Sequence, residues 1–327
     1  MKAGIWSDSP NLFDFEKSRD DYGYRWFVLR EAFKNIGIDL EIFTSRTNLE
    51  SFHFILENNI QGFNHKSKYL LMIESPLICP ENWDEEKHLQ YRKIFSWDDG
   101  LIDNKKYFKH NLGHRIPKSI PKYFEGKKLC CIIAGHKKSK TANADELYSH
   151  RVQFIRWFEK NHPNDFDLYG TNWDQFRFGH SMVARFLNKF KFLRKNNQFP
   201  SYRGTVESKF QTMKEYKFSI CYENIKDTNG YISEKIFDSF AAGCVPIYWG
   251  SRSVRNYIPK ECFIDKREFG SFDDVFKYIS TMKKEEYFDY LNNIEAFLNS
   301  EASKVFSAET FANTIVDTIT KDLNDYC

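Results

Sequence analysis

One stretch, from Tyr216 to Gly250, constrains the fold of this chain more than any other. It opens with a short apolar run, 218–222, which indicates a buried strand, and it continues into a polar loop rich in Asn, Asp and Gly. Ser233 then stands at the N-cap position of a predicted helix that ends at Gly243, and residues 245–248 form the next predicted strand. The stretch therefore predicts a strand–loop–helix–strand unit of an α/β sheet.

The predicted helix would present its N-terminus, together with Tyr231, Glu234 and Lys235, to a single point at the edge of the sheet. The first amides of a helix have no partner within the helix, and the helix dipole is positive there. Such a point suits an anion, for example a phosphate group. A Glu-Lys pair in a first helical turn is also common on solvated surfaces, so the pair alone does not identify a site.

Apolar segments with the periods of strands and helices alternate along the rest of the chain. A stretch with two prolines, 113–126, interrupts them and is the predicted linker between domains of residues 1–120 and 127–327. Alternating strands and helices predict doubly wound parallel sheets, which bind ligands at the carboxyl ends of their strands. The other predicted strands are 2–7, 40–43, 68–73, 94–97, 129–134, 166–169 and 262–265, and the predicted helices are 26–36, 51–57, 145–161, one near 254–257, and those from 271 onward.

The composition narrows the class of protein. With 48 basic and 45 acidic side chains, the formal net charge of +3 is too balanced for a dedicated nucleic-acid binder. The seven cysteines show neither paired spacing nor a zinc-type cluster, so we expect buried free thiols in a reducing compartment. The start of the sequence, MKAGIWSDSP, lacks the apolar core of a signal peptide. No apolar run reaches the about 20 residues of a membrane-spanning helix, so we expect a cytoplasmic protein.

Three blocks of the strand–loop–helix–strand unit together resemble the donor-binding motif of the α-1,3/α-1,4-fucosyltransferases, glycosyltransferase family 10. They are YKFSICYEN, then Tyr231, Glu234 and Lys235, then AGCVPIYWG, and a looser resemblance covers residues 66–270. The resemblance implies an α/β fold of the GT-B type, in which two doubly wound Rossmann-like domains face a central cleft. It also implies that these three side chains, together with Ser233, bind the donor GDP-fucose.

Glu74 is the expected general base. It follows the near-continuous apolar run KYLLMI, which predicts a strand covered on both faces, so its carboxylate would enter the cleft at the carboxyl end of that strand. Partial burial there would raise its pKa and suit it to accept a proton. The Glu-Ser-Pro block resembles the general-base motif of the family. Without that resemblance, a glutamate that caps the following segment is the simpler interpretation.

The resemblance implies further donor-binding residues in the second domain. Arg151 lies early in a predicted helix, and an arginine can hold a diphosphate with two parallel hydrogen bonds. The alternatives are that Arg151 is a solvated helix residue, or that Arg156 has this role instead. Of Glu223 and Asn224, the asparagine is the expected donor contact. Lys209 is the remaining candidate, in a block YRGTVESKF that resembles a family segment near the nucleotide.

Two further patterns compete with this interpretation. Asp165-Phe166-Asp167 matches the DxD motif that binds manganese and nucleotide sugars in the other large transferase fold, but it is also the start of a predicted strand near the domain surface. Basic and apolar residues are interleaved in RFLNKFKFLRKNN, 185–197, which suits either peripheral contact with an anionic membrane or a basic excursion near the acceptor cleft. HKKSK, 136–140, is interpreted as a solvated loop.

The residues and the resemblance together predict an inverting transferase that moves L-fucose onto a sugar hydroxyl, with an α-1,3 or α-1,4 linkage. Glu74 would take the acceptor proton, while Arg151, Lys235 and the helix amides would stabilise the departing GDP. These groups would replace a metal ion, so we expect no cofactor and no strict need for a divalent cation. The expected partners are GDP-fucose and an acceptor oligosaccharide or glycoconjugate, such as the GlcNAc of N-acetyllactosamine. The alternatives are a GT-B transferase with another nucleotide sugar, and a catalytically inactive glycan-binding protein on the same scaffold.

Overall fold

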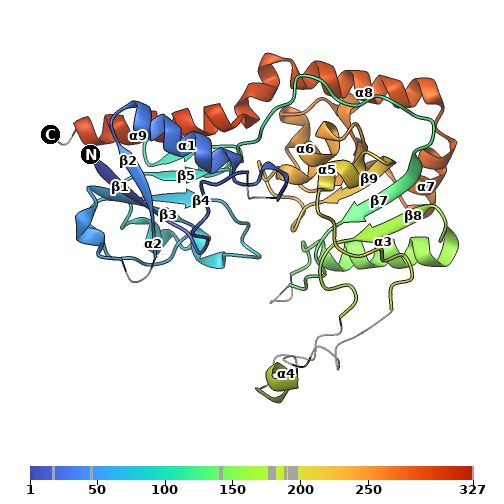
Figure 1. Ribbon diagram of the computed structural model, residues 1–327, viewed down its shortest axis with the longest axis horizontal. Coiled ribbons are helices and arrows are strands. Elements are labelled where there is room, and N and C mark those ends of the chain that lie inside the picture. Colours follow the sequence, from blue (N-terminus) through green and yellow to red (C-terminus); the bar gives the residue numbers. More distant parts are fainter. Residues whose placement is uncertain are drawn as a thin grey trace.

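Two parallel β-sheets lie side by side in the computed structural model, each with helices packed on it (Figure 1). The arrowheads of β4 and β5 point toward the second sheet, and that of β7 points back toward the first. The carboxyl ends of the two sets of strands therefore face each other, which is where doubly wound sheets bind their ligands. The structure describes residues 1–16, 19–44, 47–139, 143–175, 182–187, 190 and 198–325.

The first sheet has six strands in the order β2-β1-β3-β4-β5-β6, all paired in parallel. The strand order reverses between β1 and β3, so the topological switch point lies at the carboxyl ends of these two strands. Strand β4 is buried along its whole length, as its unbroken apolar run predicts. The strands are β1 (Lys2–Trp6), β2 (Asp39–Phe43), β3 (Phe54–Asn58), β4 (Lys68–Met72), β5 (Ile94–Ser96) and β6 (Tyr107–Lys109).

Strand β3 corrects one prediction. The sequence predicts a helix over 51–57, but Phe54–Asn58 pairs with β1 and β4 in the middle of the sheet, after a 3-10 helix at Leu49–Ser51. The apolar side chains of β3 are completely buried, and a short apolar run of this kind has no period that separates a strand from a helix. Strand β6, at the edge of the same sheet, has no prediction in the sequence.

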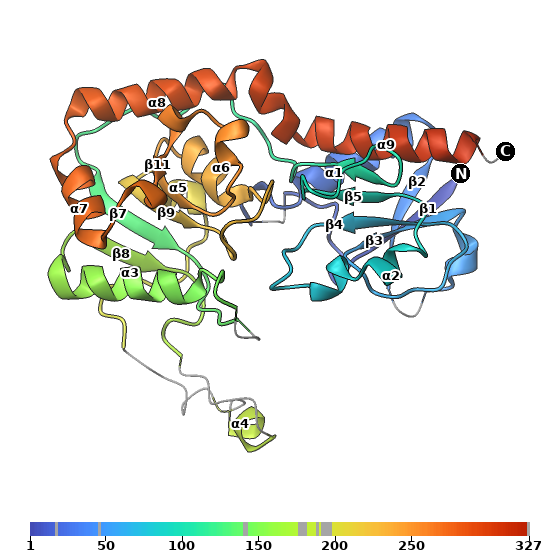
Figure 2. The ribbon, with the colours of Figure 1, turned by 180° about the vertical axis from the view of Figure 1, so that it is seen from behind.

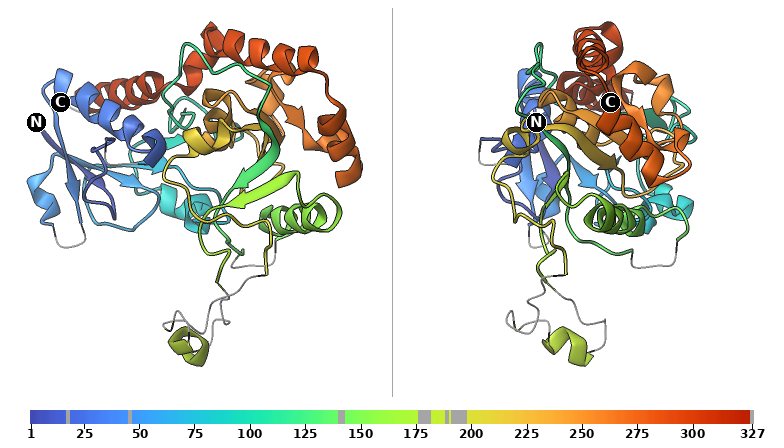
Figure 3. Two further views of the ribbon diagram at one scale, coloured as in Figure 1. Left: turned by 45° about the vertical axis from the view of Figure 1, so that its right-hand side comes forward. Right: turned by 90° about the vertical axis from the view of Figure 1, so that its right-hand side faces the viewer.

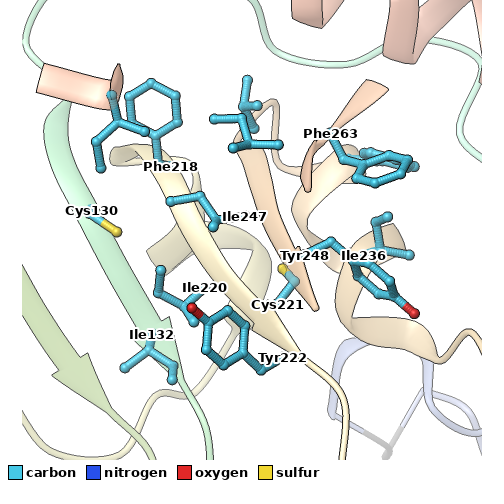
Figure 4. Close-up of a cluster of buried hydrophobic side chains, with 14 of the residues drawn as sticks. Cys130, Ile132, Phe218, Ile220, Cys221, Tyr222, Ile236, Ile247, Tyr248 and Phe263 are labelled. Carbon is cyan, nitrogen blue, oxygen red and sulfur yellow. The ribbon is translucent and has the colours of Figure 1, made fainter. Parts of the chain in front are cut away.

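The second sheet has five parallel strands in the order β11-β10-β9-β7-β8, with its reversal between β7 and β9. Its core is continuous from strand to strand. Figure 4 shows Cys130, Ile220 and Ile247 from three neighbouring strands within one cluster of buried side chains, with Ile236 of the helix that follows β9. The strands are β7 (Lys128–Ile133), β8 (Phe166–Tyr169), β9 (Tyr216–Tyr222), β10 (Val245–Trp249) and β11 (Ile264–Asp265).

The helices follow the sequence pattern with shifted boundaries. The helix predicted over 145–161 begins at Tyr148, and the one predicted near 254–257 is a 3-10 helix, Val254–Asn256. Gly243 follows α6 with a φ of +60°, as its predicted position after the helix requires. The α-helices are α1 (Tyr24–Asn35), α2 (Glu85–His88), α3 (Tyr148–Asn161), α4 (Met182–Leu187), α5 (Lys209–Met213), α6 (Glu234–Ala241), α7 (Phe272–Thr281), α8 (Lys284–Leu298) and α9 (Ala308–Asn324).

The chain crosses between the two sheets twice. The linker, 113–126, leads to the second sheet without regular structure, and α8 and α9 lead back to the first (Figures 1 and 2). Phe311, Ile315 and Ile319 of α9 are buried in the same apolar cluster as side chains of β1 and α1. By sequence, α9 belongs to the second predicted domain, 127–327, whereas its packing is with the first sheet.

Helix α4 lies well away from both sheets (Figures 1 and 3). Met182, Val183 and Phe186 on this short helix are exposed to 88%, 69% and 58% of their surface. Most of the interleaved basic and apolar stretch, 185–197, falls on positions outside the described residues, so contact with a membrane stays a prediction. Among the helices that the structure describes, none has the length and apolar character that crossing a bilayer requires. All six cysteines within the described ranges are free thiols, and five of them are buried.

Candidate functional site

The two sheets meet in an apolar cluster beside the carboxyl ends of their strands. Trp97, which follows β5, packs with Tyr231, which precedes α6, and the centroids of their rings are 4.7 Å apart. Asp99 of the first domain accepts hydrogen bonds from the hydroxyl groups of Ser253, at 3.0 Å, and of Tyr257. These contacts hold the segment that carries Tyr231 directly against the first domain.

Glu74 lies at this meeting point, two residues beyond the end of β4. Its backbone amide donates a hydrogen bond of 2.9 Å to Oδ1 of Asn59, and the amide of Ile73 donates one of 3.0 Å to the same oxygen. Asn59 has a φ of +61°, so the turn that ends β3 supplies the side chain that fixes the end of β4. Ile73 also packs against the cluster that contains Tyr231. The sheet therefore places the carboxylate of Glu74 next to the second domain.

Charged groups from both domains surround Glu74. Burial raises the pKa of its carboxyl group above the ordinary value, and the nearby cations Lys137, Lys235 and Arg25 act in the opposite direction. Because Lys235 is close enough to act on this pKa, the predicted base and the predicted cation of α6 lie in one site. Lys137 belongs to the stretch that the sequence indicates as a solvated loop. It is exposed, as expected, but it also contributes positive charge beside Glu74.

Arg151 is buried in the first turn of α3 and holds the carboxyl end of β9. Its Nη2 atom donates hydrogen bonds of 2.6 and 2.7 Å to the carbonyl oxygens of Tyr222 and Glu223, and one of 3.2 Å to Oδ1 of Asn224. Its guanidinium lies over the ring of Tyr148, 5.1 Å from the centroid. Burial lowers the pKa of Arg151. Among the described residues no carboxylate lies within ion-pair distance of it, so carbonyl and amide dipoles stabilise its charge.

A completely buried carboxylate, that of Glu223, organises the N-terminus of α6. Its Oε1 accepts a hydrogen bond of 2.8 Å from the amide of Ser233, and its Oε2 accepts bonds of 2.7 Å from the hydroxyl of Ser233 and 3.0 Å from Nζ of Lys235. Ser233 does occupy the N-cap position, but its hydroxyl caps no helix amide. The amide and hydroxyl of Ser233, which the sequence assigns to the donor, are therefore engaged with Glu223.

Lys235 and Glu234 leave part of their surface free at the site. Their side chains are exposed to 24% and 35%, and Nζ of the lysine lies 3.8 Å from Oε1 of the glutamate. Burial acts to raise the pKa of Glu234, but Lys235, Lys209 and Arg25 outweigh this effect, so the net shift is downward and the carboxylate is ionised at neutral pH. Lys209 pairs with Asp238 at 2.7 Å and thereby connects α5 to α6.

Two patterns in the sequence do not reach the site. Asp167 lies near the amino end of β8, at the edge of the sheet opposite the site. It pairs with Lys128 at 2.9 Å and with Arg203 at 2.6 Å. Its DxD pattern is thus part of a structural network, as the strand-start interpretation predicts. Arg156, the alternative to Arg151, pairs with Glu159 at 2.8 Å. Within the ranges that the structure describes, no group of three His, Cys, Asp or Glu side chains is placed to hold a metal ion.

Two residues at the site, Arg25 and Tyr148, carry no recognisable signal in the sequence. Arg25 is buried in the first turn of α1 and lowers the pKa of both Glu74 and Glu234. Tyr148 is buried with a hydroxyl group that has no partner among the described residues. A third residue, Glu223, does have a signal, its place in the YEN block, but the resemblance favours the neighbouring Asn224 as the donor contact.

A family profile and two relatives in sequence indicate one family. The profile of "Glycosyltransferase family 10 (fucosyltransferase) C-term" matches residues 127–316, more than half of the chain. An α-(1,3)-fucosyltransferase of Helicobacter pylori is 36% identical over 88 residues, which are 26% of this chain and 18% of that protein. An α-(1,4)-fucosyltransferase of Arabidopsis thaliana is 34% identical over 70 residues, 21% of this chain and 17% of that protein. The matched stretches thus span less than a fifth of these two relatives.

Solved structures match over nearly the whole chain and confirm the predicted GT-B architecture. A crystal structure of an α1,3-fucosyltransferase with GDP superposes with a TM-score of 0.57 at 15% identity, covering 98% of this chain and 90% of that one. A sucrose-phosphate synthase of Thermosynechococcus elongatus superposes with a TM-score of 0.58 at 7% identity, covering 100% of each chain. At such low identity these likenesses concern the fold: two parallel-sheet α/β domains with their strand ends facing each other.

Proposed function

Because this chain belongs to glycosyltransferase family 10, we propose that it transfers L-fucose from GDP-β-L-fucose to a hydroxyl group of an acceptor glycan, with inversion at the anomeric carbon. One observation carries the proposal. A carboxylate from the first domain, Glu74, and an ammonium group from the second, Lys235, lie within electrostatic range of each other at the facing strand ends. This is the arrangement that an inverting transferase needs, with a base on one side of the sugar and cations at the leaving group on the other.

Glu74 acts as the general base. Its ionised carboxylate accepts the proton of the acceptor hydroxyl while that oxygen attacks the anomeric carbon of fucose, on the face opposite GDP. The anomeric C–O bond to the diphosphate breaks, and the sugar passes through a transition state with oxocarbenium-ion character. Burial raises the pKa of Glu74 toward that of a more effective base, and the hydrogen bonds that the amides of Ile73 and Glu74 donate to Asn59 hold the backbone there.

Charge grows on the diphosphate as the bond breaks, and the second domain supplies the groups that stabilise it. Lys235 is held by the carboxylate of Glu223 and remains partly exposed, so its ammonium group can contact a phosphate. Arg151 fixes the loop after β9 through hydrogen bonds to its backbone, and it also donates a hydrogen bond to the side chain of Asn224 in that loop. Glu234, ionised and partly exposed, is suited to accept hydrogen bonds from the ribose hydroxyls. We propose that these side chains serve in place of a divalent cation.

We further propose which kind of sugar hydroxyl accepts the fucose. The two relatives described above are named for α-(1,3) and α-(1,4) transfer, which supports a 3- or 4-hydroxyl of a sugar such as the GlcNAc of N-acetyllactosamine. The acceptor would enter from the side of the first domain, because Glu74 comes from that domain. We propose that the protein modifies an oligosaccharide or glycoconjugate in the cytoplasm, with or without contact at a membrane surface.

The proposal is tested with the purified protein and a panel of nucleotide sugars. GDP release and transfer to N-acetyllactosamine are expected with GDP-fucose, and NMR of the product should show an α-linkage formed from the β-linked donor. Turnover should persist in EDTA. Turnover of another GDP- or UDP-sugar, without any of GDP-fucose, would reject the donor. Glycan binding without turnover of any donor would favour an inactive scaffold. If an α-linked product forms without EDTA and all activity is lost when EDTA is added, the donor assignment stands but the metal-free mechanism is rejected.

A further inference from the structure

A buried cation of the first domain has no acidic partner in the structure. Arg25 is exposed to only 5% of its surface, and in the part of the chain that the structure describes no carboxylate lies within ion-pair distance of its guanidinium. One neighbour is the ring of Tyr22, whose centroid lies 5.8 Å from the guanidinium carbon. This arrangement is unusual, because arginine is among the residues that are almost never fully buried unless they are paired.

The absence of a partner is costly. Arginine keeps its proton at any physiological pH, so burial cannot neutralise it in the way it neutralises a carboxyl group. Leaving a buried charge uncompensated is strongly destabilising, and native proteins tolerate such exceptions mainly where function requires them. The position of Arg25 in the fold therefore matters, because it indicates which anion could compensate the charge.

Arg25 lies in the first turn of α1, the helix that follows β1, at the switch point of the first sheet. Its guanidinium lowers the pKa of Glu74 and of Glu234, so it lies near both the proposed base and the start of α6. Glu234 already interacts with two lysines, Lys235 and Lys209. The anion that Arg25 faces is therefore better supplied by a ligand bound between the domains than by a side chain.

We propose that Arg25 binds the diphosphate of the donor, so that the first domain contributes a cation to the leaving group in addition to Lys235 from the second. The inference rests on the proposed function and names one more contact at the same site. A guanidinium can bond two phosphate oxygens at once, which an ammonium group cannot. Donor binding would then connect the two domains through one anion, and it would compensate a charge that the free protein leaves without a partner.

The test compares Arg25→Gln and Arg25→Lys with Arg30→Gln, which removes an exposed arginine from the same helix. Calorimetry with GDP and with guanosine, which lacks phosphate, separates the diphosphate contact from the rest of the nucleotide. We expect Arg25→Gln to raise the Kd for GDP by about 10- to 100-fold, the range for losing a charge-assisted hydrogen bond, without changing the Kd for guanosine. Arg25→Lys should fall between, and Arg30→Gln should match the wild type.

Thermal melting guards against a simple folding defect. Since Arg25 lacks an acidic partner, Arg25→Gln should melt without GDP at or above the temperature of the wild type, and GDP should raise this temperature less than in the wild type. A Kd for GDP within twofold of the wild type would overturn the inference while leaving the proposed function intact. An unchanged Kd for GDP with a raised KM for the acceptor would also overturn it, by assigning Arg25 to the acceptor. A wild-type protein that does not bind GDP would overturn both proposals.

Discussion

Replacing Glu223 by glutamine should destabilise the protein and weaken donor binding together. The carboxylate is completely buried and accepts three hydrogen bonds, two from Ser233 and one from the ammonium group of Lys235. Glutamine has nearly the same shape but a single acceptor oxygen. Its NH2 group would face either the amide of Ser233 or the ammonium of Lys235, and neither can accept a hydrogen bond.

The size of the effect follows from these contacts. A hydrogen bond to a charged group contributes about 1.5–3 kcal/mol, and breaking a buried ion pair costs about 3–5 kcal/mol. The side chain of Lys235 is 24% exposed and can recover some hydration, so the lower end of the range applies. We therefore expect the free energy of unfolding to fall by about 3 kcal/mol in Glu223→Gln.

Urea denaturation followed by circular dichroism measures this loss, with an unchanged m-value as the sign that the folded state is intact. Glu261→Gln, an exposed glutamate on the same domain, is the matched control and should change stability by less than about 0.5 kcal/mol. Calorimetry with GDP should show weaker binding, because Lys235 loses the group that positions it. A loss of stability below about 1 kcal/mol in Glu223→Gln, with unchanged affinity for GDP, would refute this account of how α6 is held.

Two further predictions concern the base and the linker. Glu74→Gln should lower turnover by at least about 100-fold with little change in GDP affinity. The base works ionised, so wild-type kcat/KM should fall as the pH drops through the pKa of Glu74, which burial raises above its ordinary value, and a pH profile of the variant should lack this limb. Gly243→Ala should destabilise the protein by more than about 1 kcal/mol, because an added Cβ at this positive φ would lie 1.9 Å from the carbonyl oxygen of Pro121. Gly126→Ala, also at positive φ but with no atom within 4 Å of the added Cβ, should destabilise the protein less. Thermal melting of both variants beside the wild type measures the difference.

Much of this fold follows from local patterns in the sequence. Strand β4 and the unit from β9 to β10 are predictable because unbroken apolar runs, a serine at the start of a helix and a glycine just after its end are local signals. The sequence of strand β3 predicts a helix because burial on both faces removes the period-2 pattern of a strand. The packing of α9 on the first sheet depends on contacts between distant parts of the chain, which no local pattern encodes.

The site divides in the same way. Glu74 and Lys235 come together because the ends of parallel strands and the start of the following helix converge, and the sequence identifies both residues. Glu223 could not be recognised as the group that holds Lys235, because a buried carboxylate that accepts three hydrogen bonds has the same sequence signature as an exposed one. Arg25 lies far from the motif in sequence, and its proximity to Glu234 arises only when the two sheets are assembled.

The return of α9 to the first sheet has a consequence for how this protein is made. The apolar side chains of α9, among them Phe311, Ile315 and Ile319, complete a core whose remaining buried members come from the first third of the chain. During synthesis the strands of the first sheet and α1 leave the ribosome well before α9, so the face that α1 and α9 share is only partly covered until α9 emerges. The second domain can fold in the meantime. The first must remain incomplete until α9 emerges, so premature termination anywhere before α9 should release a chain with exposed apolar surface.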